Sequence, residues 1–213
     1  MKLKVCGMKY VENIQQVAEL QPDYLGFIFY EKSKRNFDGI IPELPKSIKK
    51  TGVFVNASLD EVLEKIKTYN LQAVQFHGDE SEQFCKDLKS HQENLKQVEV
   101  IKVFGIKDKF DFNILNPYEE VVDYFLFDTK GKERGGNGIT FNWKVLEKYP
   151  FSKPFFLSGG IGLAQIEEIN KIRKTDLPIY GLDVNSKFEI EAGLKSVENI
   201  KKFKEIVITN KVK

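Results

Sequence analysis

The chain has 213 residues, and its 33 Lys plus Arg against 31 Asp plus Glu give a formal charge of +2 at pH 7. The basic residues are scattered among acidic ones rather than forming a stripe, so no nucleic-acid partner is expected. No apolar stretch approaches the ~18 residues of a membrane span and no signal peptide is visible, which predicts a cytoplasmic protein without a membrane partner. Cys6 and Cys85 lie in different segments and do not form a disulfide pattern.

Eight apolar runs rich in Val, Ile and Phe recur at fairly even spacing, and each ends in a polar or small residue. They do not alternate strictly with polar residues, which is typical of parallel strands covered on both faces. We therefore predict eight parallel strands. The runs are Leu3–Gly7, Tyr24–Tyr30, Gly52–Asn56, Ala73–Phe76, Val100–Phe104, Tyr124–Phe127, Phe155–Leu157 and Ile179–Val184.

The segments between the runs carry helical spacing, which parallel connections need. Ser58 and Glu61 predict a capping box at the start of the clearest helix. Residues 40–50 and 108–120 contain prolines, so short or irregular helices are expected there. The predicted apolar faces are Val11, Ile14, Val17 and Ala18; Leu59, Val62, Leu63 and Ile66; Leu163, Ile166 and Ile169; and Val197, Ile200, Phe203 and Val207.

Eight strand-then-helix units in 213 residues fit a compact (β/α)8 TIM barrel. The prediction is an α/β fold with a single barrel domain over residues 1–213. A doubly wound open sheet is the alternative, but it usually has fewer strands and a glycine-rich turn after the first one. Cys6-Gly7-Met8 is no such turn.

The active site of such a barrel forms at the carboxyl ends of the strands. Cys6 ends the first run and Asp128 follows the sixth, so both side chains would face the barrel mouth. A lone cysteine in an apolar strand is usually a small core residue. An aspartate is almost never buried unpaired, however, and two titratable groups across one mouth favour acid–base chemistry.

Glycine-rich turns predict a phosphate site. Gly159 and Gly160 lie between the seventh strand and a helix, where backbone N–H groups and the helix dipole can face an anion. Residues 181–186 supply a second loop beside them, at the usual phosphate position of barrels. The glycine-rich stretch 131–138 is either a connector or a lid over substrate. Arg35 in loop 31–38 is either solvated or paired with a substrate carboxylate.

Other chemistries fit poorly. A catalytic metal needs about three protein ligands, and of the two histidines only His77 is at a strand end, so no metal is expected. Lys102 is the one lysine within a strand that could form a Schiff base, although its alternation could place it on the outer face. The sequence contains no nucleophile elbow, Walker loop or dinucleotide fingerprint.

Motifs at seven of the eight strand ends then point to one family. In order they are KVCGM, GFIFYEKSKR, GVFVN, VQFHGDE, FDTK followed by GGNGITFNW, LSGGI and GLDVNSKFE. From Lys2 to Phe203 the chain resembles the phosphoribosylanthranilate isomerase family of tryptophan biosynthesis. The resemblance implies an Amadori rearrangement of a small phosphoribosyl substrate without metal or organic cofactor.

The resemblance also implies roles for individual residues. Asp128 would be the general acid that opens the ribose ring, and Cys6 the general base at C2′. Arg35 would hold the anthranilate carboxylate, and His77 would either touch the ligand or order its loop. The residues implied around the phosphate are Gly135, Gly136, Gly159, Gly160, Asp183, Asn185 and Ser186.

Glu191-Ala192-Gly193 stands where the family commonly has a Pro-Gly pair, but this departure removes no chemical group. Indole-glycerol-phosphate synthase would need a lysine and a glutamate at strand ends that are not found. A bifunctional isomerase of histidine and tryptophan synthesis would be expected to have an aspartate in place of Cys6. A non-catalytic phosphosugar-binding barrel is the alternative function. The sequence does not decide between a monomer and a homodimer.

Overall fold

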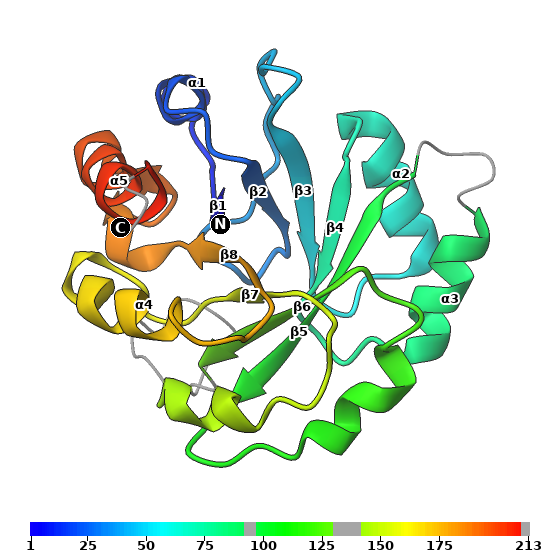
Figure 1. Cartoon of the computed structure of the whole chain (residues 1–213). Coiled ribbons are helices and arrows are strands. Elements are labelled where there is room, and N and C mark those ends of the chain that lie inside the picture. The colour runs from blue at the N-terminus through cyan, green and yellow to red at the C-terminus, as the bar shows by residue number, and fades with distance from the viewer. Residues whose placement is uncertain (92–96, 130–141, 210–213) are drawn as a thin grey trace.

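The computed structural model describes residues 1–91, 97–129 and 142–209. Eight parallel strands follow one another around a closed barrel, and the last pairs with the first (Figure 1). The closed barrel confirms the predicted fold and excludes the open sheet. The strands are β1 (Lys2–Val5), β2 (Tyr24–Phe29), β3 (Lys49–Phe54), β4 (Ala73–Phe76), β5 (Glu99–Ile106), β6 (Tyr124–Thr129), β7 (Phe155–Leu157) and β8 (Ile179–Val184).

Helices surround the barrel, because each connection between parallel strands must return along the outside (Figure 1). The Ser58 side chain accepts a hydrogen bond from the Glu61 N–H at the start of α2, as the sequence predicts. The α-helices are α1 (Val11–Glu19), α2 (Leu59–Tyr69), α3 (Glu82–Ser90), α4 (Ile166–Ile172) and α5 (Val197–Phe203). The 3-10 segments are η2 (Phe112–Tyr118), η3 (Trp143–Lys148), η4 (Leu163–Gln165) and η5 (Ser186–Phe188), and a π-helical turn, η6 (Lys204–Thr209), follows α5. None of the helices in the described ranges is long and apolar enough to cross a membrane.

The two proline-containing connectors differ. The expected irregular helix at 108–120 is η2, a 3-10 helix that includes Pro117. The expected helix within 40–50 is absent, since the described chain forms only turns and extended backbone between β2 and β3. The ring of Phe37 takes the place of a helix there, packing 5.0 Å from Phe27 and 5.8 Å from Tyr69 between ring centroids.

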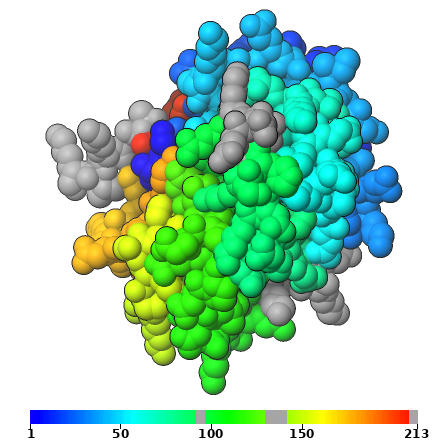
Figure 2. All heavy atoms as spheres, turned by 90° about the vertical axis from the view of Figure 1, so that its right-hand side faces the viewer, coloured from blue at the N-terminus to red at the C-terminus, as the bar shows by residue number. Residues whose placement is uncertain are grey.

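Strand alternation divides the core into two layers. One buried cluster lies inside the barrel, and a larger one lies between the strands and the outer segments. The outer segments form a continuous surface on the side of α2 and α3 (Figure 2). Lys102 shares the outer face of β5 and donates hydrogen bonds to Gly78 O (2.8 Å) and Glu80 Oε2 (2.9 Å). This placement confirms the outer-face alternative and removes the Schiff-base candidate. The inner cluster is Tyr24, Ala73, Ile101, Val103, Leu126 and Phe156.

A short antiparallel hairpin after β8 has no counterpart among the predicted elements. Its strands are β9 (Glu189–Glu191) and β10 (Leu194–Lys195). Asn13 of α1 anchors the hairpin, because its side chain exchanges two hydrogen bonds with the Lys195 backbone, at 2.8 and 2.9 Å. The hairpin therefore lies beside the carboxyl end of β8.

Candidate active site

A cavity at the carboxyl ends of the strands brings six of the predicted residues together. These residues come from five different strands or the loops after them, so only barrel closure makes them neighbours. The predicted residues that line the cavity are Cys6, Arg35, His77, Asp128, Asp183 and Asn185. The other described residues of the lining are Ile28, Tyr30, Ser33, Val53, Val55, Gln75 and Ser158.

Cys6 follows β1 with its thiol inside the barrel. A Cβ atom on Gly26 of the neighbouring strand would lie 2.8 Å from the Cys6 Sγ, so the glycine provides the space that the thiol occupies. Burial raises the pKa of Cys6, although the nearby ammonium groups of Lys4 and Lys195 oppose the shift. The buried thiol is therefore protonated in the ordinary pH range.

A buried ion pair lies next to this thiol. Lys4 precedes Cys6 by two positions, so both side chains face the same side of β1. The Lys4 Nζ atom lies 2.8 Å from Asp183 Oδ1, and Ser158 Oγ donates to the other oxygen at 3.4 Å. Burial is the largest single effect and lowers the pKa of Lys4, but Asp183 and Cys6 together outweigh it and the net shift is upward. Lys4 was missed in the sequence, although the two-residue period from Cys6 could have revealed it.

Asp128 lies near the end of β6, and the residue is only 8% exposed. Burial raises its pKa to about 6, while the Thr129 N–H, which donates to Oδ1 at 2.8 Å, acts in the opposite direction. A carboxyl group with this pKa keeps part of its proton near neutral pH, as a general acid requires.

His77 lies beside this acid. Its Nε2 atom is 3.5 Å from Asp128 Oδ2, and its Nδ1 atom is 3.4 Å from the Nε2 of Gln75. The Nε2 side of the ring therefore faces Asp128. His77 thus contacts the candidate acid directly, whereas the sequence left its role open.

The structure describes some of the residues predicted to surround the phosphate but not others. Gly159 and Gly160 have φ of +86° and +66°, the left-handed region that favours glycine. A Cβ atom on Gly159 would lie 2.6 Å from the Thr129 backbone nitrogen, so this turn packs closely against the end of β6. Ser186 begins η5, and like Gly159 and Gly160 it is absent from the described lining of the cavity. Gly135 and Gly136 lie outside the described residues.

Arg35 reaches the cavity from the loop after β2, but it also pairs with Glu189 of the hairpin. The Arg35 Nη2 atom is 2.7 Å from Glu189 Oε2, and Nε donates to both carboxylate oxygens. Glu189 in turn lies 2.7 Å from the buried Lys195 Nζ. The sequence indicated neither Glu189 nor Lys195, because both belong to the hairpin that was not predicted.

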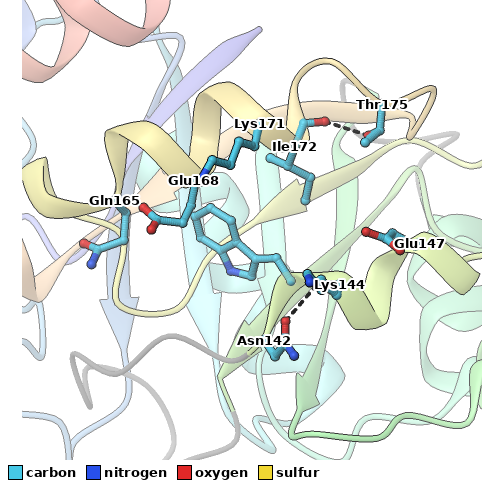
Figure 3. A pocket seen from close by; sticks show the side chains of 9 residues that line it. Asn142, Lys144, Glu147, Gln165, Glu168, Lys171, Ile172 and Thr175 are labelled. Atoms are coloured by element: carbon cyan, nitrogen blue, oxygen red, sulfur yellow. Dashed lines mark hydrogen bonds between the residues drawn. The ribbon is translucent and has the colours of Figure 1, made fainter.

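A second cavity lies in the outer layer between η3 and α4 (Figure 3). Lys144 and Glu147 line it from η3, and Glu168 and Lys171 line it from α4. No strand-end residue belongs to its described lining. Since acid and base candidates meet only in the first cavity, that cavity is the candidate active site. No cluster of three or more potential metal ligands occurs among the described residues.

Comparison with known proteins agrees with this geometry. The family model described as N-(5'phosphoribosyl)anthranilate (PRA) isomerase matches residues 3–206. The chain belongs to this family. A PRA isomerase of Parabacteroides distasonis is 43% identical over 209 residues, which cover 95% of this chain and 91% of the relative.

Solved PRA isomerases have the same fold. The crystal structure from Thermotoga maritima is 30% identical, with a TM-score of 0.82 over 99% of this chain and 100% of that one. Another PRA isomerase structure, 27% identical with a TM-score of 0.79, covers the same shares of both chains. It is a complex with reduced 1-(o-carboxyphenylamino)-1-deoxyribulose 5-phosphate.

Proposed function

We propose that this chain catalyses the Amadori rearrangement of N-(5-phosphoribosyl)anthranilate to 1-(2-carboxyphenylamino)-1-deoxyribulose 5-phosphate, a step of tryptophan biosynthesis. The observation that carries the proposal is a buried thiol and a buried carboxyl group with a raised pKa in one cavity. Family membership supports the substrate, as does the relative that binds a reduced form of the product.

Asp128 begins the reaction as the general acid. Its proton passes to the ribose ring oxygen, the C1′–O bond breaks, and the anthranilate nitrogen forms a Schiff base with C1′. With a pKa of about 6, roughly a tenth of the groups are protonated at pH 7. The neighbouring His77 Nε2 atom faces the carboxylate that remains after proton transfer, and in this scheme it donates a hydrogen bond that stabilises the charge.

Cys6 first loses its thiol proton to solvent, and the resulting thiolate removes the proton from C2′. The electron pair of the C2′–H bond moves to the Schiff base, and the resulting enolamine tautomerises to the ketone. Burial opposes formation of the thiolate, so the nearby Lys4 ammonium has an essential electrostatic effect. Substrate phosphate lies at the Gly159-Gly160 turn and the segment after Asp183 in this scheme, which uses neither metal nor organic cofactor.

The decisive experiment is a fluorescence assay with freshly generated phosphoribosylanthranilate. Loss of the anthranilate signal with the wild-type protein is expected. Cys6→Ala and Asp128→Asn should each lower kcat at least ~100-fold while KM stays within a few-fold, because both groups act mainly in the transition state.

Cys85→Ala is the matched control, since Cys85 is also buried but lies in α3, away from the cavity. It should keep the wild-type kcat. Wild-type-like turnover by either active-site variant would contradict the assigned role. A wild-type protein that binds the reduced product but does not turn over substrate would instead be the non-catalytic phosphosugar-binding barrel.

A further inference from the structure

On the basis of the proposed function, we propose that Glu189 is a positioning residue that holds Arg35 ready to bind the aromatic carboxylate of the substrate. Lys195 is the buried counter-charge that keeps Glu189 in place. This assignment concerns the hairpin after β8, which supplies no atom to the acid–base chemistry.

The contact between Arg35 and Glu189 has the geometry of a side-by-side ion pair. Arg35 Nε donates to Glu189 Oε1 at 2.8 Å, and Nη2 donates to Oε2 at 2.7 Å. Two parallel bonds fix the plane of a guanidinium group. Among the described residues, no hydrogen-bond partner is found for Arg35 Nη1, so this end of the group is left for a ligand. Arg35 also lines the catalytic cavity.

Glu189 is itself fixed by hydrogen bonds within the hairpin. Its Oε1 atom accepts from Lys195 Nζ at 2.7 Å and from the Gly193 N–H at 3.0 Å. Burial raises the pKa of Glu189, but Arg35 and Lys195 outweigh this effect and the pKa is lowered, so the carboxylate stays charged. Burial lowers the pKa of Lys195, and the Glu189 carboxylate opposes that shift. The hydrogen bond to Glu189 raises the pKa of Arg35, so Arg35 stays a cation and favours an anionic ligand at this edge of the cavity.

The bridge also determines where that ligand would lie relative to the base. The barrel order puts β1 between β8 and β2, so the Arg35–Glu189 contact spans the end of β1. A Cβ atom on Gly7 would lie 2.8 Å from Arg35 Cδ and 2.8 Å from Asn185 Oδ1. The Arg35 stem therefore rests on the residue directly after Cys6. A carboxylate bound by this guanidinium is anchored beside the base.

The test compares Glu189→Gln with Glu191→Gln, an exposed glutamate of the same hairpin. Inhibition constants are measured for the reduced product and for the same compound without its carboxyl group. Glu189→Gln should weaken inhibition by the carboxylated compound about 10-fold or more, because an Arg35 side chain that is no longer fixed loses a charged hydrogen bond to the carboxylate of the inhibitor. Inhibition by the other compound should stay within about 2-fold. Glu191→Gln should change neither constant.

In turnover assays, Glu189→Gln should raise KM with kcat within a few-fold, because a carboxylate contact made equally in ground and transition states affects binding alone. In an Arg35→Gln background the same substitution should have no further effect. Glu189→Asp, which keeps the charge but shortens the side chain, gives a second variant if Glu189→Gln does not fold.

Equal weakening of both inhibitors, or wild-type constants in both Glu189 variants, would overturn the positioning role. A wild-type protein without isomerase activity would instead contradict the proposed function, and the inhibitor comparison separates these two outcomes.

Discussion

Cys6 and Asp128 have opposite requirements in the proposed reaction, and burial acts on both in the same direction. It favours the neutral form of each group, which suits an acid and hinders a base. For Asp128, burial is the largest cause of the raised pKa, and the Asp183 carboxylate acts in the same direction. Cys6 needs compensation, and Lys4 lies two positions before it on the same strand face. The Lys4 ammonium lowers the pKa of both groups, but for Asp128 the effect of burial is larger and the pKa stays raised.

Asp128→Asn should stabilise the folded protein at pH 7.5. The pKa of Asp128 rises from 3.8 to about 6 on folding, so its contribution to stability is full below pH ~4 and is lost as the pH rises through 6. A shift of 6 − 3.8, about two pKa units, sets an upper limit of roughly 3 kcal/mol. Urea unfolding at pH 7.5 and at pH 4 measures the gain, which should vanish at the lower pH. A gain of equal size at both pH values would contradict the raised pKa.

At the scale of elements, Glu80 connects three neighbouring strands, β3, β4 and β5. Its Oε1 atom accepts from the Asn56 N–H after β3, and Oε2 accepts from the Gly78 N–H after β4 and from Lys102 of β5. His77 lies directly before Gly78 in the chain. We infer that the buried ion pair of Lys102 and Glu80 fixes the loops that follow β3 and β4 at the active site.

Lys102→Met should therefore destabilise the protein by about 3–5 kcal/mol, because removing one partner leaves the Glu80 carboxylate buried without its cation. Chemical denaturation of the purified variant measures this change. Lys65→Met is the control: Lys65 pairs at 3.6 Å with Glu64, whose side chain is exposed, so a cost of only ~0–1 kcal/mol is expected. Equal costs for the two variants would argue against the buried pair as a structural support.

At the scale of the whole molecule, the two ends of the barrel interior differ. Aromatic rings fill the amino-terminal end, where Phe156 lies 5.4 Å from Tyr24, 5.5 Å from Tyr124 and 5.2 Å from Tyr180 between centroids. The cavity with Cys6, His77, Asp128 and Asp183 lies at the carboxyl end. Stability and chemistry are therefore separated along the barrel axis, as is usual for this fold.

Phe156→Ala tests the separation. The loss of a fully buried ring should cost about 3–5 kcal/mol of unfolding free energy. Turnover at 20 °C should keep its KM within about 2-fold, provided that the variant is folded by circular dichroism, since remote core changes leave uniform substrate binding intact. Ile40→Ala, at a position 79% exposed, is the control and should cost less than ~0.5 kcal/mol. A large rise in KM for Phe156→Ala would show that the aromatic rings at the amino-terminal end also shape the substrate site.

The sequence by itself determined the barrel and the residues at its mouth. Strand and helix periods are local patterns, and eight repeats of them leave few other architectures, so Cys6 and Asp128 could be placed at one face from their positions in the runs. The proline-containing segment before β3 showed the limit of local reading, because Phe37 packing replaced the expected helix.

Only the tertiary structure decided how the site residues pair. Arg35 and Glu189 are separated by 154 positions, and Lys4 and Asp183 by 179, so no local period relates them. Both pairs exist because β8 closes against β1, which brings the two ends of the chain to the same edge of the cavity. Burial inside the closed barrel also raises the pKa of Asp128, a property that depends on what surrounds the carboxyl group rather than on its place in the sequence.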